Sequence, residues 1–302
     1  MHIFTGGIVL METLAIRRRK FRDQMDLRKA MIVPGAGNAL TARVIADQQF
    51  DAVYVTGAGI ANTLLGAPDI GLVTLTELAG TVSTIAEICH LPLVVDIDTG
   101  FGNAINTQRT VRLIERAGAF AMQIEDQVFP KKCGHFSGKA VIPVEEAVSK
   151  VKAATDARED ANMMIIARTD ARAIDGIDAA IDRAEAFIEA GADMTFVEAP
   201  RSEDEMRMIT SRLAVPQVAN MVVGGKTPLT PQSRLAELGF SLVLYANTPL
   251  QAAMRAMSEV LGTLKADGDI TAVMDRLADF DERQRLVDKD SYDRLEDQYR
   301  VK

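Results

Sequence analysis

The sequence is poor in cysteine, carries no excess of basic residues and has no long apolar segment. Only two of its 302 residues are cysteines, Cys89 and Cys133, which is too few for a disulfide framework, so we expect a reducing compartment such as the cytoplasm. The formal net charge of −8 argues against a nucleic-acid partner. No apolar run approaches the roughly 20 residues that span a bilayer, so we expect no membrane partner. The apolar start of the chain also precedes the basic residues 17–20, which is the reverse of a secretory signal.

What the sequence does contain is a regular alternation of two kinds of segment. Short apolar runs rich in β-branched residues recur along the chain, and such runs are typical of parallel strands buried on both faces. Amphipathic stretches lie between them. In residues 178–193, for example, apolar side chains recur at helical spacing and Gly191 ends the expected helix. We expect eight strands, at residues 31–36, 52–57, 93–98, 121–126, 164–169, 194–199, 216–221 and 242–247.

Eight alternating β and α units predict an α/β protein with one (β/α)8 barrel of the TIM type. We place this catalytic domain at residues 25–265, after a leader or helix over 1–24 and before a helical extension over 266–302. A doubly wound open sheet is the alternative, but the regular spacing and the lack of a GxGxxG motif favour a closed barrel. The C-terminal helical sequence is longer than one barrel position needs, so the surplus is expected to pack elsewhere, for example on another subunit.

Polar residues gather at one end of the predicted strands. The strand interiors are apolar, and chance would scatter charged residues over both ends. Because the active sites of such barrels form at the C-terminal face, this one-sided clustering predicts an active site there. The residues at these ends are Thr56 and Gly57, Asp96 and Asp98, Glu125 and Asp126, Arg168 and Asp170, Glu198, and Asn220.

The carboxylates in this set indicate a metal site. Asp96 and Asp98 are two residues apart, so both side chains are expected on one face of a strand, and Asp69 and Glu125 can add two more carboxylates. Converging carboxylates repel one another unless a cation or a proton neutralises them. Oxygen ligands without His or Cys favour Mg²⁺ or Mn²⁺ over zinc. The alternative is that the aspartates cap helices or anchor the glycine turn after the strand.

Two other strand ends suggest an anionic ligand. The segment YVTGAG, residues 54–59, ends in small residues that let backbone N–H groups approach an anion, although a tight turn accounts for the same residues. An arginine at a strand end, here Arg168, is expected to face a carboxylate. That carboxylate belongs either to a substrate or to a neighbouring glutamate.

The segment KKCGH, residues 131–135, lies on a long connection after the fourth strand, and long loops in barrels are often active-site lids. The flanking lysines and His135 should ease ionisation of the Cys133 thiol, which suits a residue that transfers a proton. A nucleophile with His135 as its base is an alternative. Another is a small loop residue without a chemical role. A zinc site would need more soft ligands than this chain offers.

The same motifs give the chain a family resemblance. Over about residues 25–265 it resembles the isocitrate lyase / phosphoenolpyruvate mutase superfamily, in which these motifs occur in the same order. KKCGH together with DIDTGFG and EDQ points to the carbon–carbon lyase branch, because the phosphonate mutases lack that cysteine. Within the branch the chain is similar to 2-methylisocitrate lyases, 2,3-dimethylmalate lyases and related plant oxaloacetate-cleaving enzymes. The motifs are YVTGAG, GAPDIG, VDIDTGFGN, QIEDQ, KKCGH, ARTDA and ANMVVGGKTP.

The resemblance implies a role for each residue at this face. Asp96 and Asp98 would hold Mg²⁺, and Asp69 and Glu125 would bond its waters. Cys133 would be the general acid, supported by His135 on a loop that closes over the substrate. The remaining residues implied in catalysis or substrate binding are Tyr54, Thr56, Gly57, Ala58, Gly134, Arg168, Glu198 and Asn220.

Three departures bear on the substrate. Relative to methylisocitrate lyases, Thr56 replaces a serine, Val222 a threonine and Gln251 an arginine. A third substrate carboxylate would need such donors, since burying an unpaired carboxylate is costly. We therefore expect Mg²⁺-dependent cleavage of a substituted malate such as 2,3-dimethylmalate to pyruvate and a carboxylate, by a retro-aldol or retro-Claisen reaction.

Three other functions remain open. The first is 2-methylisocitrate lyase, which gives pyruvate and succinate and is favoured by the scaffold sequence after Arg168. The second is a hydrolase of oxaloacetate or another 2-oxo diacid, and the third is a barrel that binds a metabolite without catalysis. The resemblance also implies a homotetramer, a dimer of dimers, whose C-terminal helices swap between subunits.

Overall fold

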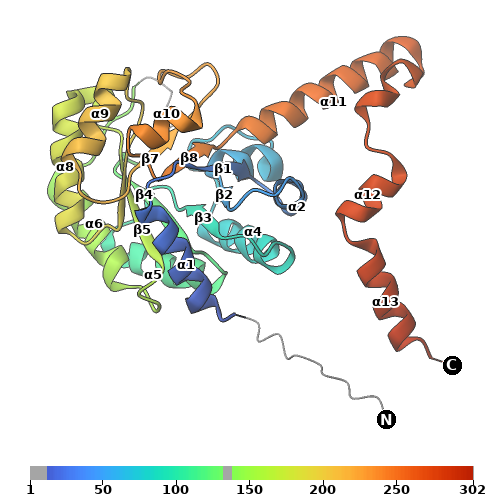
Figure 1. Cartoon of the computed structure of the whole chain (residues 1–302), viewed down its shortest axis with the longest axis horizontal. Helices are drawn as coiled ribbons and strands as arrows, with labels where there is room; N and C mark the ends of the chain where they lie inside the picture. Colours follow the sequence, from blue (N-terminus) through green and yellow to red (C-terminus); the bar gives the residue numbers. More distant parts are fainter. Residues whose placement is uncertain (1–11, 132–137, 302) are drawn as a thin grey trace.

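Eight parallel strands form a barrel at the centre of the protein (Figure 1). The computed structural model describes residues 12–131 and 138–301. The strands follow the order β6-β5-β4-β3-β2-β1-β8-β7, and a parallel bridge between Thr195 and Gln217 brings β6 and β7 together. Every strand predicted from the sequence is present, so the TIM-type barrel is confirmed. The strands are β1 (Met31–Ala36), β2 (Val53–Val55), β3 (Leu93–Asp96), β4 (Ala121–Glu125), β5 (Met164–Thr169), β6 (Met194–Val197), β7 (Val218–Asn220) and β8 (Leu242–Tyr245).

Helices alternate with these strands and surround the barrel (Figure 1). Several begin at a side chain that accepts a backbone N–H of the first turn, as Thr74 does for α4 and Asn103 for α5. The helices are α1 (Leu14–Asp26), α2 (Ala39–Asp47), α3 (Gly57–Ile60), α4 (Leu75–Ile88), α5 (Ala104–Arg116), α6 (Val144–Asp156), α7 (Arg172–Asp175), α8 (Ile177–Glu189), α9 (Glu203–Arg212), α10 (Gln232–Glu237), α11 (Thr248–Asp267), α12 (Phe280–Leu286) and α13 (Lys289–Tyr299), with a π-helix η1 (Ala61–Leu65) and a 3-10 helix η2 (Thr271–Arg276).

Side chains on each strand alternate between the barrel interior and the layer of helices. On β2, Tyr54 belongs to the interior core together with Ile166 and Phe196, whereas its neighbours Val53 and Val55 pack with residues of the surrounding helices. The same alternation continues beyond the interior core toward the C-terminal ends of the strands. It therefore turns the polar residues at those ends toward one shared space.

Helix α1 packs at the opposite, N-terminal end of the barrel. Phe21 and Met25 are fully buried in the interior core, and the ring of Phe21 meets Phe120 edge to face at 6.1 Å. The Arg18 guanidinium pairs with Glu115 at 3.3 Å and with Asp160 at 3.2 Å. This end of the barrel is thus filled by apolar side chains and ion pairs, which leaves the C-terminal end for a ligand.

The C-terminal helices leave the barrel. Helix α11 projects from it, and η2, α12 and α13 then run back beside it as an arm (Figure 1). No residue of α11 is buried, and Met254, Met257, Leu261 and Leu264 are exposed apolar side chains on it. The arm touches the barrel where Arg285 pairs with Asp47. Among the described helices, none combines the length and the apolar character that a membrane crossing requires.

Candidate active site

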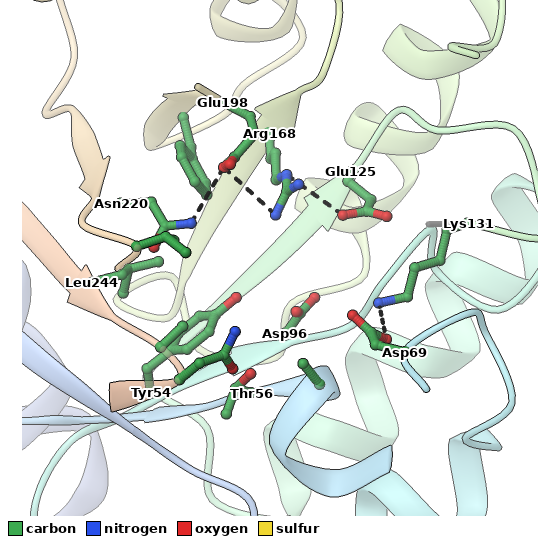
Figure 2. Close-up of a pocket in the computed structure, with 15 residues that line it drawn as sticks. Tyr54, Thr56, Asp69, Asp96, Glu125, Lys131, Arg168, Glu198, Asn220 and Leu244 are labelled. Carbon is green, nitrogen blue, oxygen red and sulfur yellow. Dashed lines mark hydrogen bonds and ion pairs between the residues drawn. The ribbon is translucent and has the colours of Figure 1, made fainter. Parts of the chain in front are cut away.

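A pocket opens at the C-terminal ends of the strands (Figure 2). Its empty space, counted out to the open mouth, is about 480 Å³. Gly57 and Asp98 adjoin the lining, while Cys133, Gly134 and His135 lie outside the described residues. Nine of the residues expected at the site line the pocket: Tyr54, Thr56, Ala58, Asp69, Asp96, Glu125, Arg168, Glu198 and Asn220.

The end of β2 turns directly into a short helix at the pocket. Thr56 is the N-cap of α3, and its hydroxyl accepts the N–H of Gly59 at 3.4 Å. Gly57 is packed so closely that a Cβ there would lie 3.1 Å from Asp98 Oδ1 and 3.4 Å from Asp96 Oδ2. The tight turn expected of this segment is present, whereas an approach of its backbone N–H groups to an anionic ligand stays a prediction. The glycine belongs to a tight turn, and its small size lets the backbone approach the carboxylates.

Asp96 is held on the pocket floor by a chain of hydrogen bonds. The Tyr54 hydroxyl donates to Gln123 Oε1 at 3.0 Å, and Gln123 Nε2 donates to Asp96 Oδ1 at 3.4 Å. The backbone N–H of Asp98 also donates to Asp96 Oδ1, at 3.0 Å. Asp96 is therefore oriented through one carboxylate oxygen, and its other oxygen faces Gly57.

Asp98 reaches the site by a different route from the one expected. Strand β3 ends at Asp96, and Asp98 lies in the following turn with a φ of 47°, in the left-handed region. Asp and Asn tolerate this conformation better than most residues. The turn, rather than the alternation of a strand, sets the direction of this carboxylate. The expectation that both aspartates share one strand face is corrected accordingly.

Lys131 is a site residue that the sequence reasoning missed, because it was considered only for its effect on the cysteine. Its Nζ lies 2.5 Å from Asp69 Oδ1 (Figure 2) and 2.7 Å from Asp98 Oδ1. Burial alone would lower the pKa of this lysine, but the surrounding carboxylates outweigh burial and raise it far above its usual range. Lys131 is therefore charged. The sequence does contain a signal for it: the expected site has more carboxylates than cations, and a pair of lysines follows the fourth strand.

Burial strongly affects the acids of this cluster. It raises the pKa of Asp98 to about 7, and the charge of Lys131 only partly offsets that rise. It raises the pKa of Glu125 well above the usual value, despite the nearby charges of Arg168 and Lys131. Carboxyl groups in such surroundings bind a proton or another cation readily.

Arg168 is held by three carboxylates on the far side of the pocket. Its Nε donates to Asp170 Oδ2 at 3.0 Å. Nε also lies 3.5 Å from Glu125 Oε2, and Nη1 lies 3.8 Å from Glu198 Oε2 (Figure 2). The guanidinium also stacks over the Phe196 ring at 5.2 Å. The expected carboxylate partner thus comes from the protein. Three anchors leave this cation fixed in position at the edge of the pocket.

The oxygen-rich half of the site fits a divalent cation in its chemistry. Asp69, Asp96, Asp98 and Glu125 supply oxygen donors, and Glu125 Oε1 is buried without a hydrogen-bond partner among the described residues. In the described part of the chain, however, no three acidic, histidine or cysteine side chains form a ready metal-binding group. The ammonium of Lys131 lies between two of the four carboxylates.

The other half of the pocket is apolar and amide-lined. Phe196, Val222, Leu244 and Ala246 form its wall, and no lysine or arginine from β6 to β8 lines it within the described residues. Gln251, in contrast, is exposed on α11 and does not line the pocket. This wall was only partly foreseen, since Val222 alone was singled out from the sequence.

Asn247 is a second missed residue. It is the N-cap of α11, yet its side chain makes no capping hydrogen bond, and its Oδ1 is buried without a partner among the described residues. It lines the pocket together with Asn220, whose Nδ2 donates to Glu198 Oε2 at 3.5 Å. Asn247 directly follows the end of β8, so the rule that selects polar strand ends would have found it.

Comparison with known proteins gives a consistent result. Residues 21–265 match the family model described as phosphoenolpyruvate phosphomutase. The sequence is 43% identical over 280 residues to 2,3-dimethylmalate lyase of Eubacterium barkeri, covering 93% of this chain and 97% of that protein. It is 42% identical over 273 residues to 2-methylisocitrate lyase of Aeropyrum pernix, covering 90% and 88%. A crystal structure of 2,3-dimethylmalate lyase, described as a PEP mutase/isocitrate lyase superfamily member, superposes with a TM-score of 0.88 at 32% identity, covering 95% and 96% of the two chains.

The charge network around Arg168 leads to a prediction about stability. Asp170 is fully buried and pairs with both Arg168 and Lys139, so Asp170→Asn removes a buried negative charge that both of these cations contact. We expect the free energy of unfolding to fall by about 3–5 kcal/mol, measured by urea denaturation followed by circular dichroism. Asp175→Asn, at an exposed position on α7, is the control and should change it by less than about 0.5 kcal/mol. A loss below about 1 kcal/mol for Asp170→Asn would contradict this account.

Proposed function

Because the chain belongs to the phosphoenolpyruvate phosphomutase family, within the PEP mutase/isocitrate lyase superfamily, we propose that it is a Mg²⁺-dependent carbon–carbon lyase. We propose as its substrate a substituted malate such as 2,3-dimethylmalate, cleaved to pyruvate and a carboxylate. The observation that carries this proposal is the two-sided pocket. One side gathers carboxylates and fixed cations, and the other offers an apolar wall.

The 2-hydroxy acid part of the substrate would bind on the charged side. Asp96 and Asp98, with Asp69 and Glu125 beside them, would hold a divalent cation, which when bound supplies Lewis acidity toward the C2 oxygen and its carboxylate. Backbone N–H groups near Gly57 and Ala58 would bind that carboxylate, since the absence of a side chain at Gly57 permits a close approach. This binding places the C2–C3 bond over the pocket, between the charged side and the apolar wall.

The bond-breaking step begins with loss of the C2 hydroxyl proton to a base. The C2–O bond becomes a carbonyl, the C2–C3 bond breaks, and its electron pair moves into the departing half as a carboxylate enediolate. Arg168, fixed by its three anchors, would stabilise the negative charge that develops there. Cys133 would then protonate the carbon, with His135 supporting the thiol and Gly134 contacting the substrate. From 2,3-dimethylmalate the products are pyruvate and propionate.

The apolar wall supports a methyl group on the departing half. Val222 stands beside Leu244 and Phe196, and a third carboxylate against these side chains would lack a charged donor among the described residues. The alternative in the same family is 2-methylisocitrate, which is favoured by the identity to the A. pernix enzyme. Glu198, Asn220 and Asn247 would meet the polar atoms of either substrate.

The direct test measures pyruvate release with Mg²⁺ from 2,3-dimethylmalate and 2-methylisocitrate in parallel. Preference for dimethylmalate supports the proposal. Preference for methylisocitrate would mean that another group binds the third carboxylate. Activity on oxaloacetate alone would identify the protein as a hydrolase instead of a lyase. No turnover of any diacid would indicate a protein that binds a metabolite without catalysis.

The proposed acid leads to a prediction about turnover. General acid catalysis contributes about 10²- to 10⁴-fold, so Cys133→Ser should lower kcat at least about 100-fold. Pyruvate binding in the presence of Mg²⁺ should persist, as measured by calorimetry. Cys89→Ser is the matched control, because Cys89 is buried in the core between the barrel and its helices and should leave turnover per folded molecule unchanged. Near-normal turnover of Cys133→Ser would remove this thiol from the mechanism.

The apolar wall leads to a prediction about specificity. Val222→Thr replaces a methyl group with a hydroxyl of similar size, which can donate to a third carboxylate. One such hydrogen bond is worth about 1 kcal/mol, so kcat/KM for 2-methylisocitrate should rise about fivefold relative to 2,3-dimethylmalate. Val223→Thr is the control, since Val223 is 57% exposed and does not line the pocket. An equal effect of both variants, or no shift in the ratio, would contradict a role for Val222.

We also propose a homotetramer, a dimer of dimers, in which the C-terminal arm packs on a neighbouring subunit. The exposed apolar side chains of α11 support this arrangement, because an isolated chain would leave them in water. Sedimentation equilibrium should give a mass of about four chains, and Met257→Asp with Leu261→Asp should reduce it. A monomeric wild-type protein would refute the assembly.

A further inference from the structure

Lys131 extends its ammonium group into the cluster of carboxylates proposed to hold the divalent cation. The group lies 2.5 Å from Asp69 (Figure 2) and 2.7 Å from Asp98, and the lysine side chain is only 3% exposed. It approaches from the first part of the connection between β4 and α6. Two of the four carboxylates expected around the metal are therefore already paired with a cation of the protein itself.

Arg168, the second cation of the pocket, does not lie beside Asp69 and Asp98. The guanidinium of Arg168 pairs with Glu125 and Glu198 on the other side of the pocket (Figure 2), and also with Asp170. Among the described residues, Lys131 is thus the cation that neutralises Asp69 and Asp98. Without a positive charge there, these acids would repel each other and Asp96 in a poorly solvated space.

A divalent cation needs the same oxygens. Asp98 Oδ1 is the atom that contacts Lys131, and a Cβ at Gly57 would lie 3.1 Å from this oxygen and 3.7 Å from Lys131 Nζ, so the region is tightly packed. Positive charges that share a carboxylate at such short range repel each other strongly where water is largely excluded. The lysine and a metal ion therefore compete for the carboxylate of Asp98.

We propose that Lys131 is a built-in counterion that competes with the divalent cation for Asp69 and Asp98. This inference rests on the proposed metal dependence and goes beyond it. Metal binding displaces the ammonium from Asp98 into the pocket, where a substrate carboxylate can become its new partner. Lys131 thereby weakens binding of the metal alone. It also couples the two ligands, so that the metal binds more tightly when the anionic ligand is bound, and the anionic ligand binds more tightly when the metal is bound. Such coupling is reciprocal by thermodynamic necessity.

The first test measures Mn²⁺ binding without substrate, by the electron paramagnetic resonance signal of the free ion. Lys131→Met should bind Mn²⁺ at least about tenfold more tightly than wild type, and Lys131→Arg, which keeps the charge, should not. Adding pyruvate should tighten Mn²⁺ binding in wild type and have a smaller effect in Lys131→Met. The control is Lys152→Met, which removes an exposed lysine that pairs with Asp156 on α6, and it should leave the Kd for Mn²⁺ unchanged.

The second test uses the wild-type protein, so that it does not depend on the folding of a variant. Amine acetylation read by mass spectrometry should increase at Lys131 when Mg²⁺ is added and stay unchanged at Lys139. Unchanged labelling of Lys131, or Mn²⁺ binding to Lys131→Met that is equal to or weaker than wild type, overturns the competition while leaving a metal-dependent lyase in place. A wild-type protein that binds no divalent cation overturns both this inference and the proposed metal dependence.

Discussion

Buried negative charge at the mouth of the barrel is the constraint around which this site is organised. Six acids, from the ends of the four strands β3 to β6 and from one loop, meet in or beside a pocket with little access to water, and burial raises the pKa of Asp98 and Glu125. Such an arrangement is stable only with cations close by. The protein supplies three of them, Lys131, Lys139 and Arg168, and each is paired with at least one of these acids.

The barrel fold determines which acids and cations contribute to this balance of charge at its mouth. Alternation along the strands sends apolar side chains into the interior core and polar ones of the same parity to the mouth. The N-terminal end is filled by α1 through Phe21 and Met25, so a ligand can enter only from the opposite end of the described structure. The fold therefore separates the residues that stabilise it from the residues that bind, and it allows strained features such as the left-handed turn at Asp98.

The two sides of the pocket divide the proposed reaction between them. Under that proposal the carboxylates and Lys131 would adjoin the 2-oxo acid, while Arg168 would face the charge that develops on the departing half. The wall of Phe196, Val222 and Leu244 would select what that half carries.

The eight strands, the closed barrel and the face that carries the site could be predicted from the sequence, because alternation and strand-end polarity are local patterns. Most of the carboxylate set and Arg168 could be predicted in the same way. How these groups pair became visible only in the folded chain: Lys131 lies between Asp69 and Asp98, Asp170 anchors Arg168, and Gln251 stays outside the pocket. The left-handed conformation of Asp98 was not predicted either, because several backbone conformations are open to an aspartate in a turn. The pairing of Lys131 with Asp69 and Asp98 depends on distances between segments far apart in the chain, and periodicity along a sequence contains no information about such distances.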